Sequence, residues 1–218
     1  MIIRKLAIGV EFMKYVILGI ILIAISSFIN CYIIRKIYSD KFKVWYKCLY
    51  KDAACILFTA SILVIQIPLI IKYDITITYG IYSVLSLLLI TIAWIDIKTK
   101  KIPNILVIIG IILGLISMFI NEDITIYSSI LGAVIISGIL IVLSLITKGA
   151  IGMGDAKVFF FIGLFLGLSA SISVFIFSIL ISGIISVLLL MFRVVNRKTA
   201  IPFAPFIFIS TLLIIIMN

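Results

Sequence analysis

Long uncharged apolar stretches, separated by short charged islands, constrain this 218-residue chain more than any other feature. Most of these stretches have about 16 to 23 residues, and a helix of that length crosses roughly 30 Å of hydrocarbon. With 65% hydrophobic and 12% charged residues, the chain has too little polar surface to coat a water-soluble globule of this size. It is therefore predicted to be an all-α, polytopic helix bundle whose solvent is the lipid bilayer.

About eight transmembrane helices are expected, in a single integral membrane domain covering residues 1–218. The segment 158–192 holds 35 uncharged residues, which as one helix would extend about 52 Å and overshoot the bilayer. It must fold back, and its least hydrophobic part, 168–173, is the predicted turn. The spans are placed at 15–34, 53–71, 79–95, 102–120, 124–146, 158 to the turn, 172–192 and 202–217.

Positive charge sets the expected orientation in the membrane. The net charge of +10 comes from residues beside the spans, which favours a topological role over a nucleic-acid partner. Lys and Arg number 14 in the loops on one side and four on the other, so the positive-inside rule makes the first side cytoplasmic. Three basic residues before position 15 favour the opposite orientation or a signal peptide, but no small-residue cleavage site follows them. The cytoplasmic loops are predicted at 35–51, 96–104, 147–157 and 193–201.

Asp96 lies where a long apolar segment ends on a carboxylate, in the stretch AWIDIKTKKIPN. Ionisable groups near lipid are costly unless they have a partner or a task. Pro103, a residue type suited to the first turn of a helix, is expected to begin the next span. Asp96 is therefore predicted to be held at the cytoplasmic edge of the membrane.

Asp155 lies in the stretch GAIGMGDAKVFFF, directly before another apolar segment. Gly149, Gly152 and Gly154 are expected to let the backbone turn closely and to leave room for an extended substrate. The helix dipole is positive at a helix N-terminus, so this position favours the ionised acid. Asp155 is predicted to lie on the same membrane face as Asp96.

Two carboxylates carried by separate helices can share a proton, so that one activates a water and the other protonates a scissile carbonyl. The composition is compatible with this aspartic-protease chemistry. The chain has no histidine, and Cys31, Cys48 and Cys55 form no CxxC pair, so no metal site, no cofactor and no Ser-His or Cys-His nucleophile are expected.

Each aspartate also has a plainer interpretation. Asp155 could be a helix N-cap, and Asp96 could pair with Lys98 or Lys157 in a solvated loop. GxxxG pairs, Gly110 with Gly114 and Gly163 with Gly167, are predicted to be helix-packing contacts.

At these residues the sequence resembles the prepilin peptidase family, the membrane aspartyl proteases with a GxGD motif. A weaker match is SSFINCYIIR in the first span, and IPFAPF at 201–206 is similar to the family's C-terminal motif PFGPF. The two main matching segments are Asp96 with Lys98, Thr99, Ile102, Pro103 and Asn104, and then Gly152 and Gly154 with Asp155 and Lys157.

This resemblance implies a peptidase that removes the basic leader of type IV prepilins or pilin-like precursors at the cytoplasmic face of the cell membrane. It implies that Asp96 and Asp155 are catalytic, and that Gly152, Gly154, Lys157, Pro103 and Asn104 support them. The short loop 35–52 replaces the tetracysteine region of bifunctional family members, so N-methyltransferase activity is not expected.

Two other functions stay open at this point. A presenilin-like intramembrane protease also uses GxGD, but its aspartates lie on neighbouring spans, whereas two predicted spans separate them here. A non-enzymatic transporter or scaffold could carry intramembrane carboxylates without hydrolysing anything.

Overall fold

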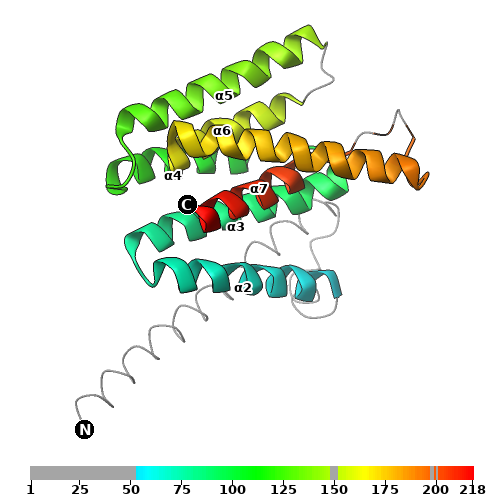
Figure 1. The fold of residues 1–218 in the computed structure, drawn as a ribbon. Helices are drawn as coiled ribbons and strands as arrows, with labels where there is room; N and C mark the ends of the chain where they lie inside the picture. Colours follow the sequence, from blue (N-terminus) through cyan, green and yellow to red (C-terminus); the bar gives the residue numbers. More distant parts are fainter. Residues whose placement is uncertain (1–52, 148–151, 197–198, 200) are drawn as a thin grey trace, which may run out of the picture. The chain divides into compact units, whose positions relative to one another are not determined.

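The computed structural model describes residues 53–147, 152–196, 199 and 201–218, with side chains from residue 60 onward. Regular structure in these described ranges is entirely α-helical, which confirms the predicted class. The first predicted span, 15–34, and the loop 35–52 lie outside the described residues. The helices are α2 (Ala53–Tyr73), α3 (Ile77–Thr99), α4 (Asn104–Ile120), α5 (Ile126–Ile146), α6 (Met153–Met191) and α7 (Ala204–Met217) (Figure 1).

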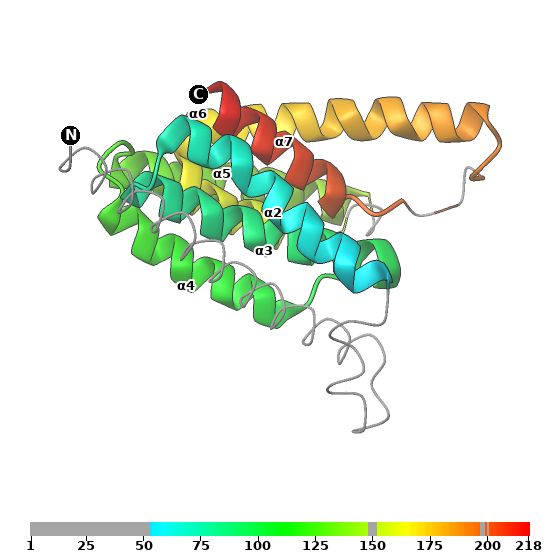
Figure 2. The same ribbon diagram turned by 90° about the horizontal axis from the view of Figure 1, so that it is seen from below.

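The chain divides into two compact units, residues 1–68 and 69–218. The described part of the first unit is the beginning of α2, up to Pro68, which lies inside that helix. The second unit holds the last turn of α2 and the helices α3 to α7. Both aspartates belong to this second unit, in which α3 and α7 lie side by side (Figures 1 and 2).

Helix boundaries in the second unit follow local capping rules. Thr76 precedes α3 and accepts the N–H of Tyr79 at 3.2 Å, and Thr125 precedes α5 and accepts the N–H of Ser128 at 3.3 Å. Lys100 ends α3 in the left-handed conformation and donates its N–H to the carbonyl of Asp96. These caps therefore set the beginning of α3 and α5 and the end of α3, close to the predicted span limits.

Helix α6 folds back on itself at Gly167 (Figure 1). Its φ of 74° and ψ of −178° interrupt the helix and separate a first arm, 153–166, from a second arm, 168–191. The rings of Phe159 and Phe175 lie 5.5 Å apart edge to face, whereas 16 residues of straight helix would separate them by about 24 Å. The predicted fold-back is confirmed, but it occurs at Gly167 rather than within 168–173. Backbone freedom decided the place, since glycine adopts this conformation without a Cβ penalty.

Small residues let the first arm of α6 lie close to α4 and α5. A Cβ added to Gly110 would come within 2.9 Å of the Phe161 ring, and one on Gly114 would lie 3.0 Å from Leu164 Cβ. A Cβ on Gly163 would overlap the backbone of Ala133. These three glycines are packing contacts, as predicted, and Gly167 is one as well, because its backbone lies against Gly132, in addition to forming the turn.

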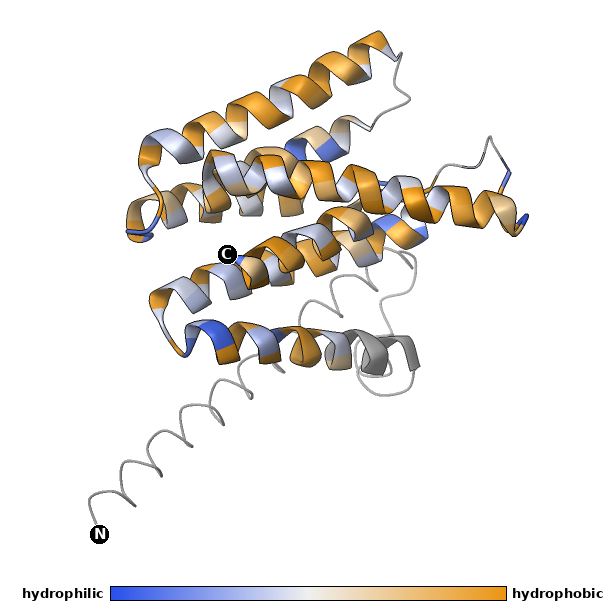
Figure 3. Cartoon of the chain, viewed as in Figure 1, coloured by the Kyte–Doolittle hydropathy of each residue, from blue (hydrophilic) through white to orange (hydrophobic). Residues whose placement is uncertain are grey.

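Many large apolar side chains are exposed on the helices while others are buried, and hydrophobic residues occur along the length of every helix (Figure 3). By length and composition, three helices of the described ranges are suited to cross a membrane, namely α3, α5 and α6. Helices that are hydrophobic all round suit a lipid environment. The molecule therefore has the properties of a membrane protein.

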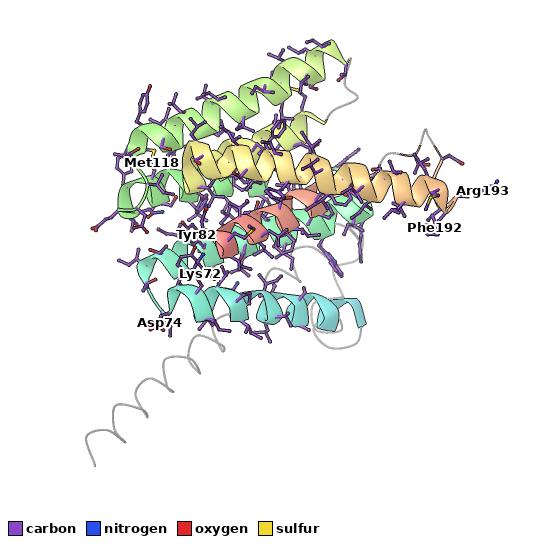
Figure 4. All side chains as sticks on the ribbon, in the orientation of Figure 1. Lys72, Asp74, Tyr82, Met118, Phe192 and Arg193 are labelled. Atoms are coloured by element: carbon purple, nitrogen blue, oxygen red, sulfur yellow. The ribbon has the colours of Figure 1, made fainter. Side chains whose placement is uncertain are left out.

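The end of the second unit at which α3 begins is closed by hydrogen bonds to helix ends. Lys72 donates to the carbonyls of Ile215 and Ile216 in the last turn of α7, and the Tyr73 hydroxyl donates to Ile215 at 2.7 Å. A lysine at a helix C-terminus also interacts favourably with the helix dipole. Figure 4 labels Lys72 beside Tyr82, and the second arm of α6 ends far away at Phe192 and Arg193.

Candidate active site

Asp96 lies in the last turn of α3, one turn before the helix ends at Thr99. Its side chain is only 6% exposed. Carboxylate Oδ2 accepts the backbone N–H of Ala204 at 3.2 Å, from the first residue of α7, and the N–H of Phe203 also acts on this carboxylate. Asp96 is therefore not a solvated loop residue. Its polar partners are backbone amides, and Lys98 instead lies over the Trp94 ring.

These amides are available because they lie at the start of a helix, and the neighbouring prolines limit the free amides to these two. An α-helix begins with N–H groups that have no partner inside the helix, and Pro202 and Pro205 have no N–H at all. Phe206 donates its N–H to the carbonyl of Phe203 at 3.0 Å. The free amides at the start of α7 are thus those of Phe203 and Ala204, and both act on Asp96.

Asp155 lies in the first turn of α6, the third residue of the helix. Gly152 is the N-cap and makes no side-chain cap bond, so the N-cap interpretation of Asp155 is wrong. The Asp155 side chain is half-buried, and the negative charge acting on it comes from Asp96. The fold therefore brings the two predicted aspartates together, across the packing of α3 and α6.

The glycines before Asp155 provide space rather than unusual backbone angles. Gly152 has a φ of −68°, which any residue adopts, and Gly154 is helical. A Cβ on Gly152 would lie 3.0 Å from Asp155 Oδ2, and one on Gly154 would lie 3.1 Å from Ile102 Cδ1. The expected close turn is wrong for these two positions, and Gly149 lies outside the described residues. The missing side chains leave space for the Asp155 carboxylate beside Gly152 and for Ile102 beside Gly154.

The segment after Asp96 packs against the beginning of α6. Pro103 is the N-cap of α4, in an extended conformation, and the helix begins at Asn104, so the proline precedes the first turn that it was expected to begin. The Lys157 ammonium group donates a hydrogen bond to Asn104 Oδ1 at 3.0 Å. With Ile102 against Gly154, this bond fixes the α3–α4 turn beside the aspartates.

The arrangement gives the two acids different surroundings. A hydrogen bond to a charged group contributes about 1.5–3 kcal/mol, whereas a helix terminus alone contributes about 0.3–1 kcal/mol. Asp96 has amide donors from another helix, while Asp155 has only the start of its own helix among the described residues. No group of three or more metal-ligating side chains occurs in those ranges. Such a pair can exchange protons with a bound water and a polarised carbonyl.

Residue-by-residue inference missed the connection between the segment 201–206 and Asp96. The IPFAPF stretch was expected only to begin the last span, and it does begin α7. A signal was available in the spacing of its prolines, which leaves two consecutive residues, Phe203 and Ala204, with free amides at the start of the helix. Only the packing of α7 on α3 determines which carboxylate they meet.

Comparison with known proteins agrees with these motifs. Residues 83–187 match the Type IV leader peptidase family. Among curated proteins, the Prepilin leader peptidase/N-methyltransferase of Bacillus subtilis (strain 168) is 32% identical over 126 residues, covering 58% of this chain and 51% of that protein. The chain thus spans about half the length of the curated relative it matches. No solved structure matches. Residues 83–187, which contain both aspartates, are therefore similar to the type IV leader peptidase family.

Proposed function

We propose that the chain is a membrane aspartyl endopeptidase that removes the basic leader peptide from type IV prepilins or pilin-like precursors. Asp96 and Asp155 are its catalytic residues, and they act on the scissile peptide bond through an activated water. Gly152, Gly154 and the Lys157–Asn104 contact support their positions. The proposal covers peptidase activity alone and includes no cofactor.

The observation that carries this proposal is the meeting of two acidic side chains from α3 and α6 within one unit. Like charges held close together favour a state in which the pair retains one proton. One carboxylate then takes a proton from water while the other protonates the carbonyl oxygen. Neither histidine nor metal is needed for this reaction.

The distribution of charge supports cleavage at the cytoplasmic face. Five of the six described basic residues lie in segments at the end of the helices where the aspartates are, namely Lys98, Lys100, Lys101, Lys157 and Arg193. Lys72 lies at the other end, together with three acidic residues, Asp74, Glu122 and Asp123. Basic residues concentrate on the cytoplasmic side of membrane proteins, so the aspartates face the cytoplasm in a multi-pass arrangement of about eight spans.

The order of the helices separates this proposal from a presenilin-like protease. Helices α4 and α5 lie between the two that carry the aspartates, whereas the presenilin-like pattern expects neighbouring spans. The match to the type IV leader peptidase family also favours a prepilin peptidase over a presenilin-like protease. The substrate is therefore a leader-bearing precursor whose apolar helix stays in the lipid.

The test is co-expression with a candidate prepilin in a host that lacks other prepilin peptidases. The precursor mass is compared for the wild type, Asp96→Asn and Asp155→Asn. We expect loss of the leader only with the wild type, because each carboxyl is needed for proton transfer. Membrane yield of each variant is the control for folding.

Processing by both variants would rule out the two-aspartate mechanism and favour a transporter or scaffold. If the wild type does not process the first precursor, a panel of prepilins and pseudopilins is tested next. Failure across that panel, with folded protein in the membrane, would overturn the proposed function.

A further inference from the structure

The two aspartates of the pair are not equivalent, because only one of them meets another helix. Asp96 is almost fully buried and accepts the Ala204 N–H at 3.2 Å. It lies near the C-terminus of α3, an end whose dipole disfavours an anion, and the positive N-terminus of α7 opposes that effect. An ionised carboxylate is the form that accepts such donors best.

Asp155 has weaker support for a negative charge. It lies in the first turn of its own helix, whose dipole favours an anion, but the described residues supply no hydrogen-bond donor to its carboxylate. Its charged neighbour is Asp96, which repels a second negative charge. Asp155 is half-buried whereas Asp96 is almost fully buried, so the Asp155 carboxyl is the more accessible of the two.

Among the described residues, the lysines nearest the pair in sequence have other contacts or are exposed, as Lys100 and Lys101 are after α3. On α6, the ammonium of Lys157 is engaged with Asn104. On α3, Lys98 lies over Trp94, with its ammonium 5.5 Å from the ring centroid. Helices α4 and α7, which pack on the same region, carry no charged residue.

We propose that the start of α7 is a backbone clamp, made by the N–H groups of Phe203 and Ala204, that keeps Asp96 anionic and leaves the shared proton on Asp155. Phe203 and Ala204 are thus positioning residues. The inference rests on the proposed function for its catalytic meaning, although the clamp itself is a property of the folded chain.

The assignment orders the proton transfers of peptide hydrolysis. Water oxygen bonds to the carbonyl carbon while Asp96 takes the water proton, and Asp155 gives its proton to the carbonyl oxygen. When the carbon–nitrogen bond breaks, Asp96 returns a proton to the leaving nitrogen. Asp155 then recovers its proton from a hydroxyl of the intermediate as the new carboxyl forms, so both residues regain their starting states.

Infrared spectroscopy of the purified full chain in lipid nanodiscs tests the clamp without substrate. The protonated-carboxyl band is followed against pH in Asp155→Asn, which reports Asp96, and in Asp96→Asn, which reports Asp155. Spectra of the variant carrying both changes are subtracted to remove the other acidic residues. We expect the Asp155 band to persist to a pH at least about one unit higher than the Asp96 band.

The decisive change is an amide-to-ester replacement at residue 204, which removes its N–H and keeps its side chain. In the Asp155→Asn background it should move the disappearance of the Asp96 band upward by about one pH unit. In the Asp96→Asn background it should leave the Asp155 band in place. The matched control is an ester at Ile207, whose N–H bonds to the Phe203 carbonyl inside α7 at 3.2 Å.

The clamp would be overturned if the Asp96 and Asp155 bands disappeared at the same pH or in the reverse order. It would also be overturned if the esters at residues 204 and 207 shifted the Asp96 band equally. Because these spectra require no turnover, their outcome is independent of the prepilin assay. Expected spectra with no processing of any precursor would leave the clamp standing and refute the proposed function. If the wild type processes a precursor but the ester at residue 204 has no effect on the spectra, the proposed function stands and the clamp is refuted.

Discussion

The two ends of the first arm of α6 differ in their contacts. One end makes polar contacts, and the other packs closely against the backbone of α5. At residue 155 it meets α3 through a pair of acids, with Lys157 bonded to Asn104 beside them. At Gly167 it ends against the backbone of Gly132 and the Ser128 hydroxyl, which accepts the Leu168 N–H at 3.0 Å. The same helix thus presents reactive groups at one end and close backbone packing at the other. Substitutions at the first end should change activity, and those at the second should change stability.

The largest effect is expected from Asp155→Asn at the polar end. Loss of a group that transfers protons should reduce leader removal by about 100- to 10,000-fold. The midpoint of heat-induced unfolding in detergent should stay the same or rise, because a repulsion between like charges is removed. A variant that loses stability along with activity would contradict the division between the two ends.

At the closely packed end, Gly167→Ala should destabilise the protein by about 2–4 kcal/mol. Its φ of 74° and ψ of −178° are unsuited to a residue with a Cβ, which would also lie 2.8 Å from Ile124 Cγ2 and from Ser128 Oγ. The unfolding midpoint in detergent measures the effect. The matched control is Gly183→Ala in the second arm, where no atom lies within 4 Å of the new Cβ, and it should be neutral or slightly stabilising. Equal effects of both changes would refute the special role of Gly167.

Gly152→Ala should lower the rate of leader removal about tenfold, equivalent to about 1.4 kcal/mol, with little change in unfolding midpoint. The new Cβ would lie 3.0 Å from Asp155 Oδ2, so the carboxyl must shift from its place beside Asp96. Time courses of precursor processing at equal membrane levels measure the effect. An unchanged rate would mean that activity does not depend on the space that Gly152 leaves beside the Asp155 carboxylate.

The smallest effect is expected from the contact between Asn104 and Lys157. Asn104→Ala removes the acceptor of an exposed bond, so leader removal should fall only by about two- to fivefold. Asn104→Asp is the matched control, because its carboxylate can still accept the lysine ammonium. The same processing time course compares the two variants, and equal activity would show that the contact does not position the α3–α4 turn.

Much of the helical architecture is legible in the sequence, because apolar length and charged islands reflect the cost of burying polar groups in lipid. The predicted spans from 53 onward have helical counterparts, and the fold-back within 158–192 followed from length alone. Its location did not, since hydropathy marked 168–173 and the backbone conformation of Gly167 decided the turn. The glycines of the GxGD motif were likewise assigned to backbone shape, whereas the packed structure uses their missing side chains.

The sequence by itself determined which residues carry charge near lipid, and so it pointed to Asp96 and Asp155 and to the family. Tertiary structure decided what surrounds each acid, because the Ala204 amide that donates to Asp96 lies more than 100 residues away along the chain. No local pattern reports such a contact. It exists because α7 packs along α3 with its N-terminus at the carboxylate, and hydrogen bonding depends on distance and direction in space rather than on order in the chain.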